Sequence, residues 1–184
     1  MTQPSRRRGI LVGRWRDSQA QMKSLLILRH AKSSWADPML DDHDRPLNKR
    51  GRRDAPRMGR FMRDEALVPD IIVTSTARRA SDTAEVVAEA AGYSGEIVWD
   101  EALYAAPASA YVAVLWALDD DAASVLLVGH NPAVEHLVGV FAGRPERMPT
   151  AALAHIALAI DRWAAADPAD SAELAGIWRP KELS

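Results

Sequence analysis

The sequence predicts an α/β fold of three layers, in which helices cover both faces of a largely parallel central sheet. Short apolar segments alternate along the chain with longer segments whose apolar residues recur at helical spacing. Uninterrupted apolar segments are typical of strands buried on both faces, as in parallel sheets. A chain of 184 residues, 48% of them hydrophobic, suffices for one such domain.

Six segments are predicted as strands, namely 25–28, 71–73, 97–98, 125–128, 153–160 and 172–178. Segments 25–28, 71–73 and 125–128 are the clearest, because each is an apolar run bounded by polar or turn-forming residues. In 153–160 larger apolar residues alternate with smaller ones, which indicates one tightly packed face. We expect segment 172–178 to be an edge strand.

Four helices are predicted between these strands. Asn48 is suited to cap the first, which Pro56 is expected to kink or delay. Gly92 and Gly143 are suited to end the second and the fourth. The residues expected to face inward are, helix by helix, Ala55, Met58, Phe61 and Met62; Ala80, Ala84, Val87, Ala88 and Ala91; Val112, Leu115 and Trp116; and Val134, Leu137, Val138 and Phe141.

Composition narrows the classes of function. A formal net charge of −2 gives no basis for binding nucleic acid or an anionic membrane. The absence of cysteine excludes disulfides, thiolate metal sites and cysteine nucleophiles. No segment approaches the roughly 20 apolar residues of a membrane span. We expect a cytoplasmic protein; nothing in the sequence predicts its oligomeric state.

The N-terminal segment differs from the rest of the chain. Residues 1–22 are rich in arginine, and the apolar run 10–12 that follows Arg6-Arg7 is too short for an export signal. We predict a flexible basic tail over residues 1–22 and a single domain over residues 23–184.

Unusual polar residues follow three of the predicted strands. Arg29 and His30 come directly after the first strand, Arg79 lies a few residues after the second, and His130 follows 125–128. Ligands bind at the carboxyl ends of strands in open α/β sheets. If these strands are neighbours, two histidines and two arginines converge on one site.

The residues around His130 predict an anion-binding site. Gly129 allows another group to approach the backbone closely. Asn131 is suited to an N-cap and Pro132 to the first turn of a helix, whose N-terminus favours an anion. The guanidinium groups of Arg29 and Arg79 match phosphate oxygens in pairs. The expected ligand is therefore a tetrahedral dianion.

An imidazole flanked by arginines is a candidate nucleophile toward phosphorus. Surrounding cations lower its pKa and keep the attacking nitrogen unprotonated. The same cations stabilise the charge on the transferring group. We expect His30 to be phosphorylated and water then to attack the phosphohistidine. Two arginines would repel a metal ion, so no metal and no other cofactor is predicted.

Three ordered motifs resemble those of the histidine phosphatase superfamily, also known as the phosphoglycerate mutase-like family. Segment 26–31, Leu-Ile-Leu-Arg-His-Ala, resembles the Arg-His-Gly/Ala signature, and segments 75–84 and 128–131 resemble the second and third elements. The second element selects Arg79 rather than Arg78, and the third supplies His130. Segments 31–35, 42–47 and 178–181 are similar to the SixA-type phosphohistidine phosphatase branch. The resemblance covers residues 23–182.

The sequence departs from the superfamily pattern at one position. Many members carry a glutamate in a Leu-x-Glu context, which donates a proton to the leaving alcohol, whereas this chain has Ala105 there. The SixA-type branch resembles the chain in this respect. An imidazole leaves more easily than an alkoxide, so it needs less help from an acid. Glu101, Asp42 and Asp44 are alternative acids, each expected to be solvated or structural.

These observations predict a metal-independent phosphatase that acts on phosphohistidine in proteins or on a small phosphorylated metabolite. Alternatives are a broad phosphomonoesterase or mutase-like enzyme, and a non-catalytic module that binds phosphoproteins. The predicted catalytic residues are His30, Arg29, Arg79 and His130. The predicted substrate contacts are Arg29, Arg79, His130, Ser33 and His43, of which His43 contacts the rim of the site or braces its loop. Ser75 is expected to form a turn.

Overall fold

The computed structural model describes residues 22–167 and 172–183, so the tail predicted at 1–22 lies outside the described residues except for Met22. One sheet contains the six predicted strands: β1 (Lys23–Arg29), β2 (Ile71–Ser75), β3 (Ile97–Asp100), β4 (Ser124–Gly129), β5 (Leu153–Leu158) and β6 (Ala172–Trp178). The strand predictions are confirmed, with β5 ending before Ile160.

The strands lie in the order β3-β2-β4-β1-β5-β6. Strands β3, β2, β4 and β1 run parallel to one another, whereas β5 and β6 are antiparallel to their neighbours. The predicted, mostly parallel sheet is therefore confirmed. The parallel order also makes β2, β4 and β1 direct neighbours, so their carboxyl ends meet at one edge.

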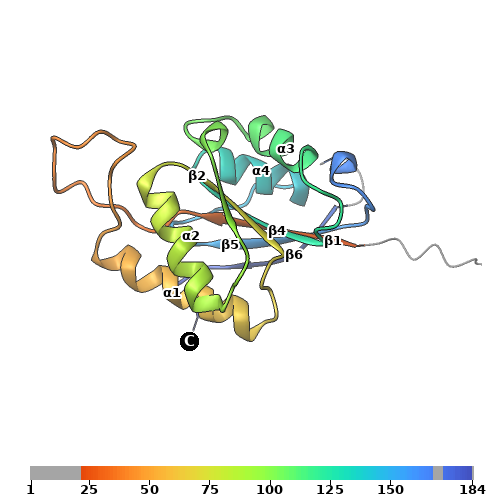
Figure 1. Ribbon diagram of the computed structural model, residues 1–184, viewed down its shortest axis with the longest axis horizontal. Coiled ribbons are helices and arrows are strands. Elements are labelled where there is room, and N and C mark those ends of the chain that lie inside the picture. Colours follow the sequence, from red (N-terminus) through yellow and green to blue (C-terminus); the bar gives the residue numbers. More distant parts are fainter. Residues whose placement is uncertain (1–21, 168–171, 184) are drawn as a thin grey trace, which may run out of the picture.

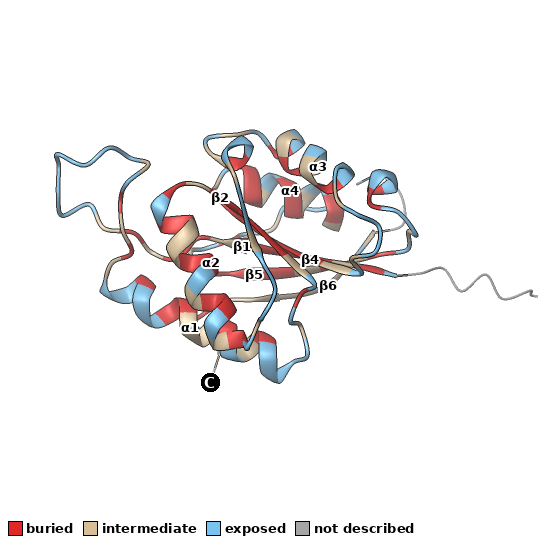
Figure 2. Ribbon diagram, in the orientation of Figure 1, coloured by how far each residue is buried: buried red, intermediate tan, exposed pale blue. Residues whose placement is uncertain are grey.

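Helices cover both faces of the sheet (Figure 1). The helices α1 (Lys49–Asp64) and α2 (Arg78–Ala91) lie on one face, and α3 (Ala108–Trp116) and α4 (Ala133–Ala142) on the other. Strand β1 alternates between them, because Leu25 and Ile27 belong to the core under α3 and α4 while Leu26 and Leu28 belong to the core under α1 and α2. Figure 2 shows β1, β2, β4 and β5 largely buried between these layers, whereas the edge strands β3 and β6 are intermediate or exposed. Burial on both faces explains why 25–28 is uninterrupted by polar residues.

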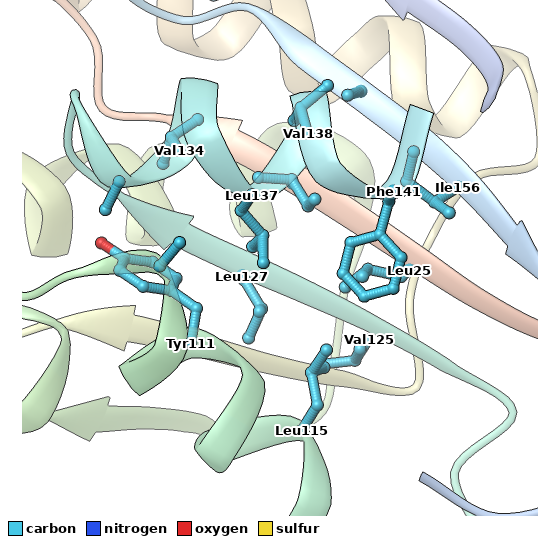
Figure 3. Close-up of a cluster of buried hydrophobic side chains, with 14 of the residues drawn as sticks. Leu25, Tyr111, Leu115, Val125, Leu127, Val134, Leu137, Val138, Phe141 and Ile156 are labelled. Carbon is cyan, nitrogen blue, oxygen red and sulfur yellow. The ribbon is translucent and has the colours of Figure 1, made fainter. Parts of the chain in front are cut away.

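The core on the α4 side is drawn in Figure 3. The side chains of Val134, Leu137, Val138 and Phe141 on α4 point toward Leu127 and its neighbours in the sheet, as predicted. On α3, Leu115 is buried, but the inward position expected for Trp116 is wrong. Trp116 is 54% exposed at the last position of α3, where its indole Nε1 donates to the carbonyl oxygen of Ala166 at 3.0 Å.

Helix ends follow the expected cap residues in three cases. The Asn48 side chain accepts a hydrogen bond from the backbone N–H of Gly51 at 3.0 Å. Gly92 and Gly143 end α2 and α4 with φ angles of 71° and 66°, a region that favours glycine. The delay expected from Pro56 is wrong, since α1 already begins at Lys49 and continues through Pro56 to Asp64.

Among residues 22–167 and 172–183, every helix is too short or too polar to serve as a membrane span.

The helices α1 and α2 approach each other closely at Gly59, where an added Cβ would lie 2.5 Å from the carbonyl oxygen of Val87 and 2.7 Å from the Cβ of Ala90. Backbone cannot yield at such a contact without moving one helix against the other.

We predict that Gly59→Ala lowers the free energy of unfolding by about 1–3 kcal/mol, the usual range for overpacking. The matched control is Gly139→Ala on α4, where an added Cβ would meet nothing closer than 3.4 Å. That change should leave stability unaltered or raise it by up to about 1 kcal/mol through helix propensity. Urea denaturation measures both. Equal stabilities for the two variants would contradict the close approach of α1 and α2.

Candidate active site

The carboxyl ends of β1, β2 and β4 bring together the polar residues that the sequence places after these strands. Arg29 pairs in register with Gly129, so His30 and His130 leave neighbouring strands side by side. Their ring centroids are 5.1 Å apart and both residues are 8% exposed. The site is therefore lined by two imidazoles that are largely shielded from water but retain some solvent contact.

The backbone and the ring of His30 are both held by hydrogen bonds. Its N–H donates to the carbonyl oxygen of Gly129 at 2.9 Å, and its Nδ1 lies 2.7 Å from the carbonyl oxygen of Ala31. Because a carbonyl oxygen only accepts, Nδ1 carries the ring proton and Nε2 keeps its lone pair. On the α2 side, Thr83 Oγ1 accepts from the N–H of Ala31 at 2.9 Å, which fixes the turn after His30.

His130 is held by β2 and by α3. Its Nε2 lies 2.8 Å from Ser75 Oγ, and its backbone N–H donates to the Tyr111 hydroxyl at 3.2 Å. Its Nδ1 is buried without a hydrogen-bond partner among the described residues. Ser75 also accepts from the N–H of Ala77 at 3.3 Å, so the expected turn-forming role is joined by a bond to His130 that sequence reasoning missed. A side chain at Gly129 would collide with Tyr111, which confirms the close approach expected there.

Burial and neighbouring cations keep both imidazoles neutral. Burial lowers the pKa of His30 to about 3, with the charges of His130, Arg79 and Arg29 acting in the same direction and the bond to Ala31 opposing them. Burial and the charge of Arg79 lower the pKa of His130 to about 4. The positive charge of Arg29 also acts on both rings and lowers the pKa of each.

Arg29 is oriented by the segment that precedes β5. Its Nη1 donates to the carbonyl oxygen of Met148 at 2.9 Å, and Glu135 Oε1 accepts from the N–H of Met148 at 2.9 Å. Burial lowers the pKa of Arg29, and the nearby charge of Glu135 opposes this shift. The N–H of Ala151 donates to the carbonyl oxygens of Arg29 and His30 at 3.0 and 3.2 Å. Segment 148–152 therefore holds both the guanidinium and the backbone of the Arg29-His30 pair.

Arg79 is held by Asp42, a contact that the sequence did not predict. Its Nη2 lies 2.9 Å from Asp42 Oδ2, and its Nη1 donates to the Asp42 carbonyl oxygen at 2.5 Å. Asp42 also accepts from Arg45 at 2.6 Å and from the Tyr104 hydroxyl at 3.1 Å. Burial raises the pKa of the Asp42 carboxyl, but the bond from Arg45 and the charge of Arg79 outweigh it and hold this pKa below its usual value.

The loop between β1 and α1 carries the other two predicted substrate contacts. His43 Nε2 lies 3.1 Å from Thr76 Oγ1, and its ring lies 4.9 Å from that of Tyr104 in an edge-on arrangement. Ser33 is buried, and its hydroxyl accepts from Arg45 Nη2 at 2.5 Å, so the structure engages it in bracing the loop. Figure 1 shows this orange segment projecting from the side of the molecule where β1 ends.

One local prediction near His130 is wrong. The N-cap of α4 is Pro132 rather than Asn131, and the helix begins at Ala133. The amide of Asn131 instead donates to the carbonyl oxygen of Met148 at 3.2 Å. Met148 thus accepts from both Asn131 and Arg29, and this tertiary bond replaces the local cap.

Of the three alternative acids, Asp42 contacts Arg79, a predicted catalytic residue. Asp44 is exposed and lies 3.1 Å from His43 Nδ1, while Glu101 is exposed on the short helix η1 (Glu101–Leu103). Ala105 is exposed, with a φ angle of 50°. Within the described ranges 22–167 and 172–183, no group of three or more His, Asp or Glu side chains is placed to hold a metal ion.

Comparison with known proteins supports one family. Residues 25–104 match the histidine phosphatase superfamily (branch 1). A protein of Mycobacterium tuberculosis is 31% identical over 165 residues, which cover 84% of this chain and all of that protein. Structures assigned as the phosphohistidine phosphatase SixA are also similar. The structure from Agrobacterium tumefaciens is 29% identical, with a TM-score of 0.74, and the match covers 86% of this chain and 98% of that one. The structure from Nakamurella multipartita is 26% identical, with a TM-score of 0.73, and the match covers 86% of this chain and 96% of that one.

The fold, the ordered motifs and these matches show that the chain belongs to the histidine phosphatase superfamily. It is thus a hydrolase that acts on phosphoryl groups. Within the superfamily, its structural relatives place it in the SixA-type branch.

The depressed pKa values of the two site histidines predict that neither ring gains a proton between about pH 5.5 and 8, whereas an unperturbed histidine titrates near 6.5. The unfolded chain binds these protons below about pH 6.5 and the folded chain does not, so the free energy of unfolding should fall as the pH drops from there toward 4. NMR of Cε1-labelled histidine, assigned with His30→Asn and His130→Asn, measures the titration. A midpoint near 6.5 for His30 would contradict the burial described above.

Proposed function

We propose that the chain is a metal-independent phosphohistidine phosphatase that carries the phosphoryl group transiently on Nε2 of His30. The observation that supports this most directly is the ring orientation of His30. Its Nδ1 is committed to the carbonyl oxygen of Ala31, so Nε2 is the nitrogen with a free lone pair. The low pKa of the ring keeps that lone pair available at physiological pH.

The reaction has two steps. In the first, Nε2 of His30 attacks phosphorus, the P–N bond of the substrate breaks, and the substrate imidazole leaves with a proton taken from solvent. In the second, water attacks the phosphorus of phospho-His30, the new P–N bond breaks, and inorganic phosphate leaves while the proton of the water passes to solvent. Arg29, Arg79 and His130 surround the transferring group. The two guanidiniums stabilise the charge on its oxygens, which is the main contribution a protein makes to phosphoryl transfer.

The lack of a glutamate at position 105 favours a phosphoramidate substrate over a phosphate ester. An alkoxide needs a proton donor, and this chain carries Ala105 where many superfamily members have a glutamate. A protonated imidazole is a far better leaving group, so phosphohistidine requires no such acid. The resemblance to structures assigned as SixA supports the same substrate class. Mutase-like activity on a phosphorylated alcohol is disfavoured for the same reason.

Two residues are proposed to position the reacting groups without contacting the substrate. Ser75 bonds to Nε2 of His130 and so fixes the orientation of that ring. Asp42 orients Arg79 through its carbonyl and carboxylate oxygens. His43 is proposed as a rim contact that tightens when a substrate is bound.

The covalent intermediate can be trapped. Brief incubation with ³²P-phosphoramidate, followed by denaturation in alkali, should leave an acid-labile, alkali-stable label on the wild-type chain. We predict that His30→Ala abolishes this label and lowers kcat by at least about a thousandfold, as expected for loss of a nucleophile.

The matched control for trapping is His136→Ala, which removes an exposed histidine on α4. It should label and turn over as the wild type does. Persistent label on His30→Ala would contradict the assignment of the nucleophile, and reversible uptake of phosphate without a covalent label in the wild type would favour a phosphate-binding module.

Activity is predicted to survive removal of metal ions. The cations needed to stabilise the transferring group are Arg29 and Arg79, which are part of the chain and would repel a divalent ion. Turnover of phosphoramidate after dialysis against EDTA should therefore equal turnover before it. Loss of activity that is restored by a divalent cation would contradict the metal-free scheme.

A further inference from the structure

Helix α1 carries a concentration of positive charge that the proposed reaction does not use. Its 16 residues include the cations Lys49, Arg50, Arg52, Arg53, Arg57, Arg60 and Arg63 but only two acids, Asp54 and Asp64. All of these cations except the half-buried Arg57 are exposed. The whole chain, by contrast, has a formal net charge of −2. Positive charge is therefore gathered on one element of a slightly acidic protein.

This arrangement does not serve the stability of the helix. Its first turn contains Lys49, Arg50 and Arg52 and no acid, although the N-terminal end of a helix dipole favours negative charge. Like charges also recur at positions three and four residues apart along the helix, where they repel one another. Among the described residues, no ion pair within 4 Å is formed by Lys49, Arg57 or Arg60. Helix cations that repel their neighbours and lack an ion pair of their own, as these three do, are typical of a functional surface.

The positive end of α1 lies next to the site. The N–H of Asn48, which caps α1, donates at 2.9 Å to the carbonyl oxygen of Lys32, two residues after His30. Arg50 Nη2 donates to Thr150 Oγ1 at 3.1 Å, and Thr150 precedes Ala151, whose N–H bonds to the carbonyl oxygen of His30. A substrate bound at His30 is therefore a neighbour of the first turn of α1.

Two adjoining hollows extend from there between α1 and the C-terminal segment. The charged residues that line the first hollow are Arg50, Arg53, Arg179, Lys181 and Asp54. The second is lined by Arg57 and Arg60, by the acids Asp64 and Glu65, and by the Phe61–Trp178 ring pair. Both also touch Glu182. The ring of Trp178, at the end of β6, lies 5.0 Å from that of Phe61 on α1, so the segment after β6 begins beside this helix. We name these two hollows together the basic groove.

We propose that the basic groove docks an acidic segment of a phosphorylated protein, so that the substrate presents Asp and Glu side chains beside its phosphohistidine. This inference rests on the proposed function. The length of the groove favours a protein over a metabolite, because Arg50 and Arg60 are separated by about 15 Å of helix at a rise of about 1.5 Å per residue. A small molecule held at His30 does not reach Arg60. The acids in the groove wall are Asp54, Asp64, Glu65 and Glu182. They disfavour the evenly charged phosphate chain of a nucleic acid, whereas a peptide can place uncharged residues opposite them.

The test compares two phosphohistidine peptides that differ only in a flanking segment of about ten residues, roughly 30 Å when extended. One carries Asp and Glu in this segment and the other Asn and Gln. For the wild type at low ionic strength we expect kcat/KM to be about tenfold or more higher for the acidic peptide, a difference that salt should remove. Arg57→Glu/Arg60→Glu should abolish the preference and leave turnover of phosphoramidate unchanged. The matched control Arg144→Glu/Arg162→Glu reverses two exposed charges outside the basic groove and should keep the preference.

Arg57→Gln/Arg60→Gln serves as a second variant if charge reversal unfolds α1, and it should remove most of the preference. Equal turnover of the two peptides by the wild type would overturn the docking proposal while leaving the proposed function intact. Failure to hydrolyse phosphoramidate and both peptides would instead overturn the proposed function. The docking proposal would also be overturned if a DNA oligonucleotide inhibited the enzyme as strongly as the unphosphorylated acidic peptide of the same charge. The groove would then be a general polyanion surface.

Discussion

The parallel pairing of β1 with β4 is the constraint on which the site depends. The register that sets Arg29 opposite Gly129 brings the next residue of each strand, His30 and His130, to the same edge of the sheet. The bond from the N–H of His30 to the carbonyl oxygen of Gly129 extends that pairing by one step beyond the strands. A one-residue slip would turn the side chains of a strand to the opposite face and separate the two imidazoles.

This geometry also determines the protonation of the site. Two imidazoles whose ring centroids are 5.1 Å apart and that share two guanidiniums cannot readily gain protons, and their burial adds to that effect. The fixed positive charge therefore comes from Arg29 and Arg79, while His30 keeps the lone pair that the proposed mechanism requires. The separate roles proposed for the cations and for His30 follow from burial and proximity rather than from any single residue.

Much of this arrangement follows from the sequence, because strong local patterns specify it. The apolar runs at β1, β2 and β4 predicted the strands, and the polar residues after them predicted which side chains converge. The partners of those side chains were harder to predict. Asp42 reaches Arg79 across 37 positions, and Asn131 bonds to Met148 instead of capping α4; such tertiary bonds leave no local pattern. The exposure of Trp116 was not predicted, because helical spacing alone does not show where a short helix leaves the core.

The loop that carries Asp42 has a consequence for the fate of the product. Any anion that binds Arg79 meets a guanidinium whose two terminal nitrogens already bond to Asp42, so it must displace those oxygens or share the remaining N–H groups with them. Either course reduces the free energy gained on binding. Under the proposed mechanism, inorganic phosphate would for that reason be held weakly once its bond to His30 is broken. A tethered carboxylate of this kind would then favour release of the product over its retention.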